Sequence, residues 1–311
     1  MGSGVPLRAA VAGDKGFGGA WNPARRRIYL VFLAPAVITL TLVTVFPFLY
    51  LLFTSLTPYQ LTKPASLTIT GLQNFEELID DSRFLNSLWV QVRLSVATVT
   101  LQLLCGLAIA MLLNARWRFI EFIRTIYIIP MVLPPVVVAI VWKVLFSPSI
   151  SPVNWASGLV GGPQPSWLTD PHLALWALVI ADTWEWFPFT MLMLLAALQM
   201  MPEEPLEAAR IDGASSWQVF QHILLPLLRP TIVVAVLFRL IDSVKAFPHI
   251  FIMTQGGPGI VTEATNYYAY MQGFSYTFVG YASAITLAML IAVFLLSFAI
   301  MKLVNTEVDV E

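Results

Sequence analysis

The chain has 311 residues, of which 58% are hydrophobic and only 11% are charged, and its mean hydropathy is +0.77. Soluble domains carry charge on roughly a quarter of their residues, so this composition predicts a membrane protein. The net charge is −1, and the 17 basic residues are scattered between apolar runs. Nucleic-acid binding needs clustered Lys and Arg, so we expect no nucleic-acid partner.

Residues 1–27 are rich in Gly and Ala near the start and lack apolar periodicity, which predicts a cytoplasmic N-terminal tail. Six apolar runs follow, and each reaches the roughly 20 residues that a helix needs to cross about 30 Å of hydrocarbon. The runs cover residues 28–53, 88–113, 119–146, 172–198, 231–253 and 278–303. We therefore expect an all-α, polytopic membrane domain of six transmembrane helices over residues 28–303, followed by a cytoplasmic tail at 304–311.

Lys and Arg are concentrated in the segments that are cytoplasmic if the chain begins inside, among them Arg25, Arg26, Arg27, Arg116, Arg118, Arg124, Arg210, Arg229 and Lys302. Because short cytoplasmic loops carry the excess of positive charge, both termini are predicted to be cytoplasmic. Residues 54–87 then form an external cap. The Gly71-Leu72-Gln73-Asn74-Phe75 sequence and the acids behind it predict a short helix in that cap.

A hydrophilic segment, about 199–229, joins the fourth and fifth runs on the cytoplasmic side. Its composition predicts two short helices with a sharp corner. Pro205 suits the first turn of a helix, Gly213 can take the left-handed conformation that ends it, and Ser215 can cap the next one. We expect Pro226 to close the second helix.

This segment carries a spaced motif. Glu207, Ala208 and Ala209 are followed, after three residues, by Gly213, and after nine more by Ile223-x-Leu225-Pro226. The pattern resembles, without a gap, the EAA loop of permease subunits in bacterial ATP-binding-cassette importers.

The resemblance implies that the two short helices are coupling helices that dock on a separate ATP-binding subunit. Glu207 would face basic or polar groups of that subunit, and Ala208 and Ala209 would permit close approach. Asp212 and Gly213 would form the corner, and the residues Ile223, Leu225 and Pro226 would anchor the loop to the fifth span.

Further stretches resemble the carbohydrate-importing branch of that family, namely residues 71–75, 184–195, 238–242 and 254–258. The resemblance implies alternating-access import of a sugar, a polyol or a sugar phosphate across the bacterial cytoplasmic membrane. It also implies the partners: a second permease subunit, which makes a heterodimer, an ATP-binding subunit dimer and an extracytoplasmic solute-binding protein.

The chain contains no GxxxxGK[ST] motif and no Gly-Lys dipeptide, so it lacks the loop that cradles nucleotide phosphates. We therefore expect a non-catalytic subunit with no cofactor of its own, and ATP and Mg²⁺ would be bound by the partner ATPase.

Charged and aromatic residues interrupt two of the apolar runs. Trp184, Glu185 and Trp186 lie in the fourth run beside Asp182, and the residues Arg239, Asp242 and Lys245 recur every third position in the fifth. A charge at mid-membrane must face a partner or a wet cavity. Two interpretations stay open: ion pairs that fasten helices, or a polar pocket in which carboxylates accept sugar hydroxyls and indoles cover the sugar face.

Two other classes of protein compete with the importer. An ion-coupled secondary transporter could use Asp182, Glu185 and Asp242 for protons, although such folds are built from internal repeats and the chain has no convincing one. A membrane enzyme finds less support, because His172 and the other two histidines lack metal-ligand spacing and no Ser has the context of a nucleophile.

Overall fold

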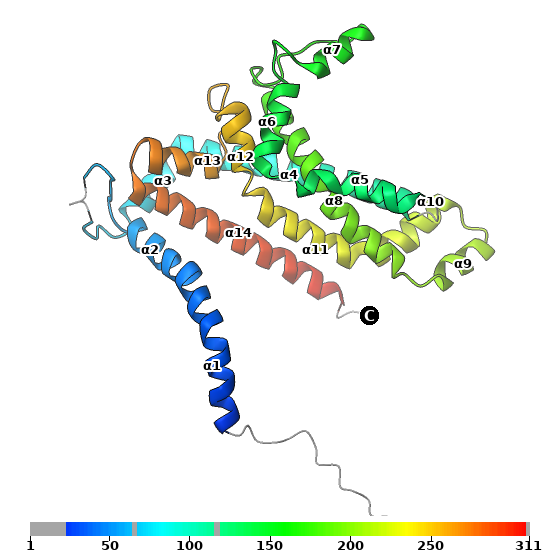
Figure 1. The fold of residues 1–311 in the computed structure, drawn as a ribbon, viewed down its shortest axis with the longest axis horizontal. Coiled ribbons are helices and arrows are strands. Elements are labelled where there is room, and N and C mark those ends of the chain that lie inside the picture. Colours follow the sequence, from blue (N-terminus) through cyan, green and yellow to red (C-terminus); the bar gives the residue numbers. More distant parts are fainter. Residues whose placement is uncertain (1–22, 64–66, 115–118, 309–311) are drawn as a thin grey trace, which may run out of the picture. The chain divides into compact units, whose positions relative to one another are not determined.

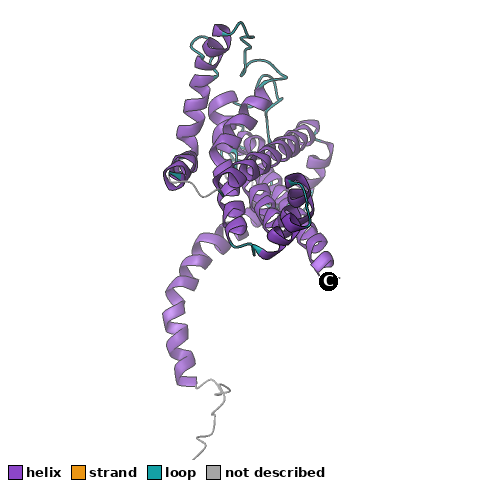
Figure 2. Ribbon diagram, turned by 90° about the vertical axis from the view of Figure 1, so that its right-hand side faces the viewer, coloured by secondary structure: helices purple, strands orange, loops and turns teal. Residues whose placement is uncertain are grey.

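The computed structural model describes residues 23–63, 67–114 and 119–308, and these form helices joined by loops (Figure 2). Most of the predicted N-terminal tail, the last three residues, and Arg116 and Arg118 of the charge count lie outside the described residues. The chain divides into two compact units, residues 1–50 and residues 51–311, and each is considered by itself.

The first unit is helical where it is described. Helix α1 (Pro23–Leu40) continues through the π-helical turn η1 (Thr41–Val45) into α2 (Phe46–Ser55), whose last residues belong to the second unit. The helix begins five residues before the predicted run at 28–53. The π turn lies just before Pro47, and there the Phe46 N–H reaches back five residues to the Thr41 carbonyl. Proline cannot complete an ordinary helical turn, and a wider turn accommodates it.

The core of the second unit is built on α4 (Ser82–Leu113) and α8 (Ala174–Gln199), which share the most extensive contact of the described helices (Figure 1). They pack tightly against each other at Gly106. A Cβ atom added there would lie 2.9 Å from the Met191 amide nitrogen and 2.9 Å from the Thr190 Cβ. Small residues allow this kind of close packing between membrane helices. The predicted fourth run, 172–198, is confirmed.

The external cap contains the short helix predicted for it, α3 (Gln73–Asp80). The Asn74 side-chain amide donates to the carbonyls of Ser55 and Thr57, both at 2.8 Å, and so ties α3 to the end of α2. The second span starts at Ser82, six residues before the predicted run, because the Asp81 carboxylate accepts the N–H groups of Arg83 and Phe84 and caps the helix.

Asp81 also connects the cap to the end of the chain. Its carboxylate accepts the hydroxyls of Tyr268 on α13 (Thr265–Tyr270) and Tyr281 on α14 (Val279–Val308), both at 2.5 Å. Burial raises the pKa of Asp81, but these hydrogen bonds and those from the backbone outweigh it and hold the pKa below its ordinary value of 3.8.

The third run, expected as one helix over 119–146, is instead two helices. Helix α5 (Ile120–Val132) and α6 (Pro135–Leu145) meet at 95°. The residue before a proline is disfavoured in the helical region of backbone conformation. Pro134 and Pro135 therefore exclude two consecutive residues from that region: Leu133 has ψ 141° and Pro134 has ψ 136°. Helix α7 (Pro152–Leu159) follows in the outer loop.

The fifth run differs most from its expected bounds, 231–253. One helix extends from Ser216 to Ser243 through α10 (Ser216–Val219), η3 (Phe220–Leu224) and α11 (Leu225–Ser243). It ends early because Pro248 would clash with the Val244 carbonyl in a continued helix. The Asn266 side chain donates to that carbonyl instead, at 2.8 Å. Two short segments follow, α12 (Phe247–His249) and η4 (Ile250–Thr254).

The turn η5 (Met271–Ser275) connects α13 to α14. Helix α14 covers the sixth predicted run, 278–303, and confirms it. In the described part of the chain, five helices are long and apolar enough to cross a membrane, and the bent pair α5 and α6 is the candidate for a sixth span.

Candidate functional site

The cytoplasmic segment between α8 and α11 begins with helix α9 (Glu204–Ile211). Pro205 lies in its first turn, as predicted, with Glu204 and Glu207 close to the positive end of the helix. Gly213 follows the helix with φ +80°. The Gly213 N–H donates to the Arg210 carbonyl at 3.1 Å and the Ala214 N–H to the Ala209 carbonyl at 2.9 Å. These two bonds make a Schellman motif, which needs a left-handed residue at Gly213.

The second half of the segment starts at Ser215. Its hydroxyl accepts the Gln218 N–H while its own N–H donates to the Gln218 side-chain oxygen at 2.8 Å, which completes a capping box. The helix that follows does not stop at Pro226, contrary to expectation. The π turn at Phe220–Leu224 widens the helix before the proline, and the Leu225 N–H bonds to the Phe220 carbonyl. The second of the two predicted short helices is therefore the first part of the helix that forms the fifth span.

The motif residues of this segment face outward. Glu207, Ala208, Asp212, Gly213 and Pro226 are exposed, Leu225 is at the lower limit of exposure, and Ala209 and Ile223 are half-buried. Two large apolar side chains stand on the same surface: Ile211 is 85% exposed and Trp217 is 67% exposed. An apolar surface beside an acidic helix start is suited to docking on another protein.

A second group of polar side chains is buried between α4, α8 and α11 and is centred on Arg239, which is 3% exposed. Its Nε donates to the Gln102 Oε1 at 2.8 Å and its Nη1 to the Asp242 Oδ2 at 2.6 Å. Its Nη2 lies 3.8 Å from the Asp182 Oδ2, and its guanidinium carbon lies 4.7 Å from the centre of the Trp186 ring. We call these five residues the arginine network.

Lys245 lies just past the end of α11 and is exposed, and its Nζ is 3.2 Å from the other oxygen of Asp242. Asp242 thus bridges Arg239 and Lys245. With Asp182 included, two formal positive charges meet two negative ones. The charges of these four side chains therefore cancel.

Glu185 and Trp184 lie apart from the arginine network. Glu185 is fully buried, and its Oε2 is 3.0 Å from the Nε2 of His249, although the angle at the nitrogen does not suit a hydrogen bond. Trp184 makes an edge contact with Trp142, with 5.9 Å between the ring centres. The six residues predicted as one pocket thus belong to separate clusters, and their contact with a transported solute stays a prediction.

Sequence reasoning left three of these partners out of the predicted site. Gln102 is an amide inside an apolar run. Asp182 is predicted only as a charge within a span, and His249 is not predicted as a site residue because the histidines are far apart in sequence. A polar residue within a transmembrane run was the available signal for Gln102 and Asp182. Nothing in the sequence pairs His249 with Glu185.

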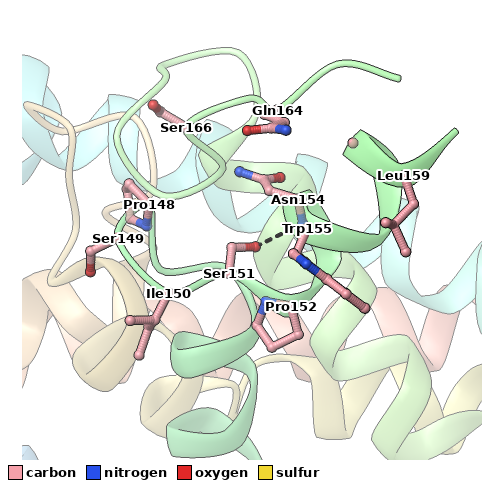
Figure 3. A pocket seen from close by; sticks show the side chains of 11 residues that line it. Pro148, Ser149, Ile150, Ser151, Pro152, Asn154, Trp155, Leu159, Gln164 and Ser166 are labelled. Atoms are coloured by element: carbon pink, nitrogen blue, oxygen red, sulfur yellow. Dashed lines mark hydrogen bonds between the residues drawn. The ribbon is translucent and has the colours of Figure 1, made fainter. Parts of the chain in front are cut away.

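The outer loop around α7 holds a pocket of about 690 Å³ (Figure 3). The Ser151 hydroxyl accepts the Asn154 N–H at 3.1 Å, and Asn154 in turn accepts the Trp167 indole N–H at 3.0 Å. The pocket has no ionisable side chain in its wall. The wall therefore offers no group for acid or base chemistry.

Comparison with known proteins identifies the family. Residues 102–310 match the family described as binding-protein-dependent transport system inner membrane component. The trehalose/maltose transport system permease protein MalF of Thermococcus litoralis is 37% identical over 75% of this chain and 78% of its own length. The trehalose transport system permease protein SugA of Mycobacterium tuberculosis is 32% identical over 90% of this chain and 89% of its own.

A solved bacterial ABC transporter involved in the import of the acidic polysaccharide alginate has the same fold. Its chain superposes with a TM-score of 0.79 at 20% identity, covering 91% of this chain and 96% of that one. Family membership does not favour the ion-coupled alternative. The chain belongs to the binding-protein-dependent transport system inner membrane components and is a multi-pass, non-catalytic permease subunit of an ATP-binding-cassette importer.

Proposed function

We propose that this permease moves a neutral sugar or polyol. The relatives named for trehalose and maltose support a carbohydrate. The charges of the arginine network and Lys245 support a neutral one, because Asp182 and Asp242 offset Arg239 and Lys245 and leave no net positive charge for a phosphate. A sugar phosphate is the alternative that the same experiment tests.

We propose the partners as well. An ATP-binding subunit dimer that carries ATP and Mg²⁺ would dock on the outward-facing motif residues Glu207 to Gly213. A second, different permease subunit would complete the transmembrane pathway, and an extracytoplasmic binding protein would deliver the solute. The exposed Ile211 and Trp217 support a protein partner on the cytoplasmic surface, since large apolar side chains are costly to leave in water.

The proposed coupling mechanism rests on one observation. The helix that starts at Ser216, beside the corner at Gly213, continues without a break to Ser243 and carries Arg239. At 1.5 Å per residue, the corner lies about 35 Å from Arg239 along one continuous helix. A displacement of the corner by the ATPase would therefore move Arg239 relative to Gln102 on α4 and Asp182 on α8.

The test is reconstitution of the full-length chain, with the subunits that co-purify, in liposomes with ATP inside. Maltose, trehalose and glycerol 3-phosphate are each supplied with a cognate binding protein. We expect ATP-dependent uptake of a neutral sugar that requires the binding protein. Uptake driven by an ion gradient without ATP would refute the importer mechanism, and uptake of glycerol phosphate alone would refute the neutral-sugar proposal.

A further inference from the structure

An apolar groove runs along the side of α4 and the start of α8. Its volume is about 560 Å³, and its wall is almost entirely carbon. Val96 and Thr100 of α4 form one side, and Val179 of α8 forms the other. Both helices are long and apolar enough to span the membrane. The groove is therefore positioned to meet lipid rather than water.

The wall of the groove contains a single cation, Arg93, and two exposed tryptophans, Trp89 and Trp176. The Arg93 guanidinium carbon lies 5.8 Å from the centre of the Trp89 ring, and Trp176 lines the groove from α8. Trp89 is 59% exposed and Trp176 is 49% exposed. No carboxylate of the described residues lies within ion-pair distance of Arg93. A cation in a membrane helix is costly unless a partner neutralises it.

The positions of Arg93 and Trp176 along their helices indicate the depth of Arg93 in the membrane. Trp176 is in the first turn of α8, and Arg93 is 11 residues after the start of α4 at Ser82. In the orientation that the distribution of Lys and Arg predicts, both helices start on the external side. Tryptophans gather at the level of the lipid headgroups, and an arginine just below them extends toward the phosphates.

We propose that this groove binds an anionic phospholipid of the outer leaflet, with the phosphate on Arg93 and one acyl chain along Val96, Thr100 and Val179. The groove offers apolar wall for the chain, and Arg93 offers one uncompensated positive charge for the headgroup. A zwitterionic lipid would fill the same groove but would leave that charge unbalanced. The inference is independent of the transported solute.

Native mass spectrometry of the full-length chain with its co-purifying subunits tests the proposal. The detergent-solubilised protein is titrated with dioleoyl phosphatidylglycerol or dioleoyl phosphatidylcholine. Three variants separate the contributions: Arg93→Gln removes the charge, Val96→Trp fills the groove, and Lys143→Gln removes another exposed cation of a membrane helix, on α6 and outside the groove. Size-exclusion elution establishes that each variant is folded.

We expect the unmodified protein to prefer phosphatidylglycerol by about fivefold, the ratio that one basic residue near a membrane surface contributes. Arg93→Gln should abolish the preference, Val96→Trp should weaken binding of both lipids, and Lys143→Gln should change neither. The proposal is overturned if the preference is absent, if it survives Arg93→Gln, or if Lys143→Gln removes it equally. It is also overturned if a photo-crosslinker at Val96 captures a protein subunit instead of lipid.

Discussion

The cytoplasmic segment at residues 204–219 and the arginine network are two polar regions of the molecule, and they are built in opposite ways. Residues 204–219 are held by contacts between near neighbours, such as the Schellman bonds around Gly213 and the capping box at Ser215. The network joins Arg239 to Gln102, 137 residues earlier in the chain. The exposed segment is therefore a local structure, whereas the buried network depends on how three helices pack.

The largest effect should come from the buried region. Arg239→Met leaves the buried Asp182 carboxylate with its hydrogen bond from Gln102 but without its cation. We expect a loss of about 3–5 kcal/mol in the free energy of unfolding because a buried charge becomes uncompensated. Lys245→Met removes the other cation that contacts Asp242, but at an exposed position. It should cost about 0–1 kcal/mol.

Thermal or denaturant unfolding of the purified protein in detergent compares the two variants. Equal losses would mean that burial does not distinguish the two cations and that the network is no more than a surface ion pair.

A change in the exposed region should affect coupling rather than folding. Glu207→Ala removes one outward-facing acid of α9. We expect sugar uptake per ATP hydrolysed to fall about tenfold, within the usual range of coupling energies, while the unfolding midpoint stays the same. Glu204→Ala, an exposed acid three residues earlier, is the control and should retain coupling. Normal uptake in the Glu207 variant would contradict the role of this segment.

The corner itself allows a finer test. At Gly213 an added Cβ meets no atom within 4 Å, so any cost of Gly213→Ala comes from the left-handed backbone alone. We expect about 1–2 kcal/mol of local destabilisation, seen as faster proteolysis of the segment in the folded protein. Gly213→Asn should be milder, because Asn tolerates this conformation. If Ala and Asn behave alike, the left-handed turn does not control the corner.

The smallest effect concerns acid stability of the external cap. The pKa of Asp81 is lower in the folded protein than its ordinary value of 3.8. The contribution of Asp81 to the free energy of unfolding is therefore complete above that ordinary value and is lost as the pH falls through the folded pKa. Unfolding midpoints should therefore decline below about pH 4. Asp81→Asn should flatten that decline, and an unchanged slope would assign the acid sensitivity to other carboxylates.

These differences explain what could be predicted from the sequence. Pro205, Gly213 and Ser215 act on their own backbone, so the corner, the first helix and the cap of the second followed from residue type. The cap helix after Gly71 and most spans followed from composition in the same way.

The features that were missed depend on spatial neighbours or on proline pairs. The break after Ser243 needs Asn266 to take the carbonyl of Val244, and the partners of Arg239 lie on other helices. Pro226 was expected to end a helix, but a π turn accommodates it, as another does before Pro47. The 95° bend at Leu133 and Pro134 follows from two adjacent prolines, although its angle depends on packing.

The close crossing at Gly106 has a consequence for which substitutions this protein can accept. Gly106 is one helical turn after Gln102, on the same face of α4. An alanine there would meet the backbone of Met191, which cannot move aside as a flexible side chain can, so α4 and α8 would have to separate. Separation would lengthen the hydrogen bond from Gln102 to Asp182, now 2.8 Å. In a saturation-mutagenesis library selected for sugar uptake, position 106 should therefore retain only glycine, while exposed Val96 accepts most apolar residues.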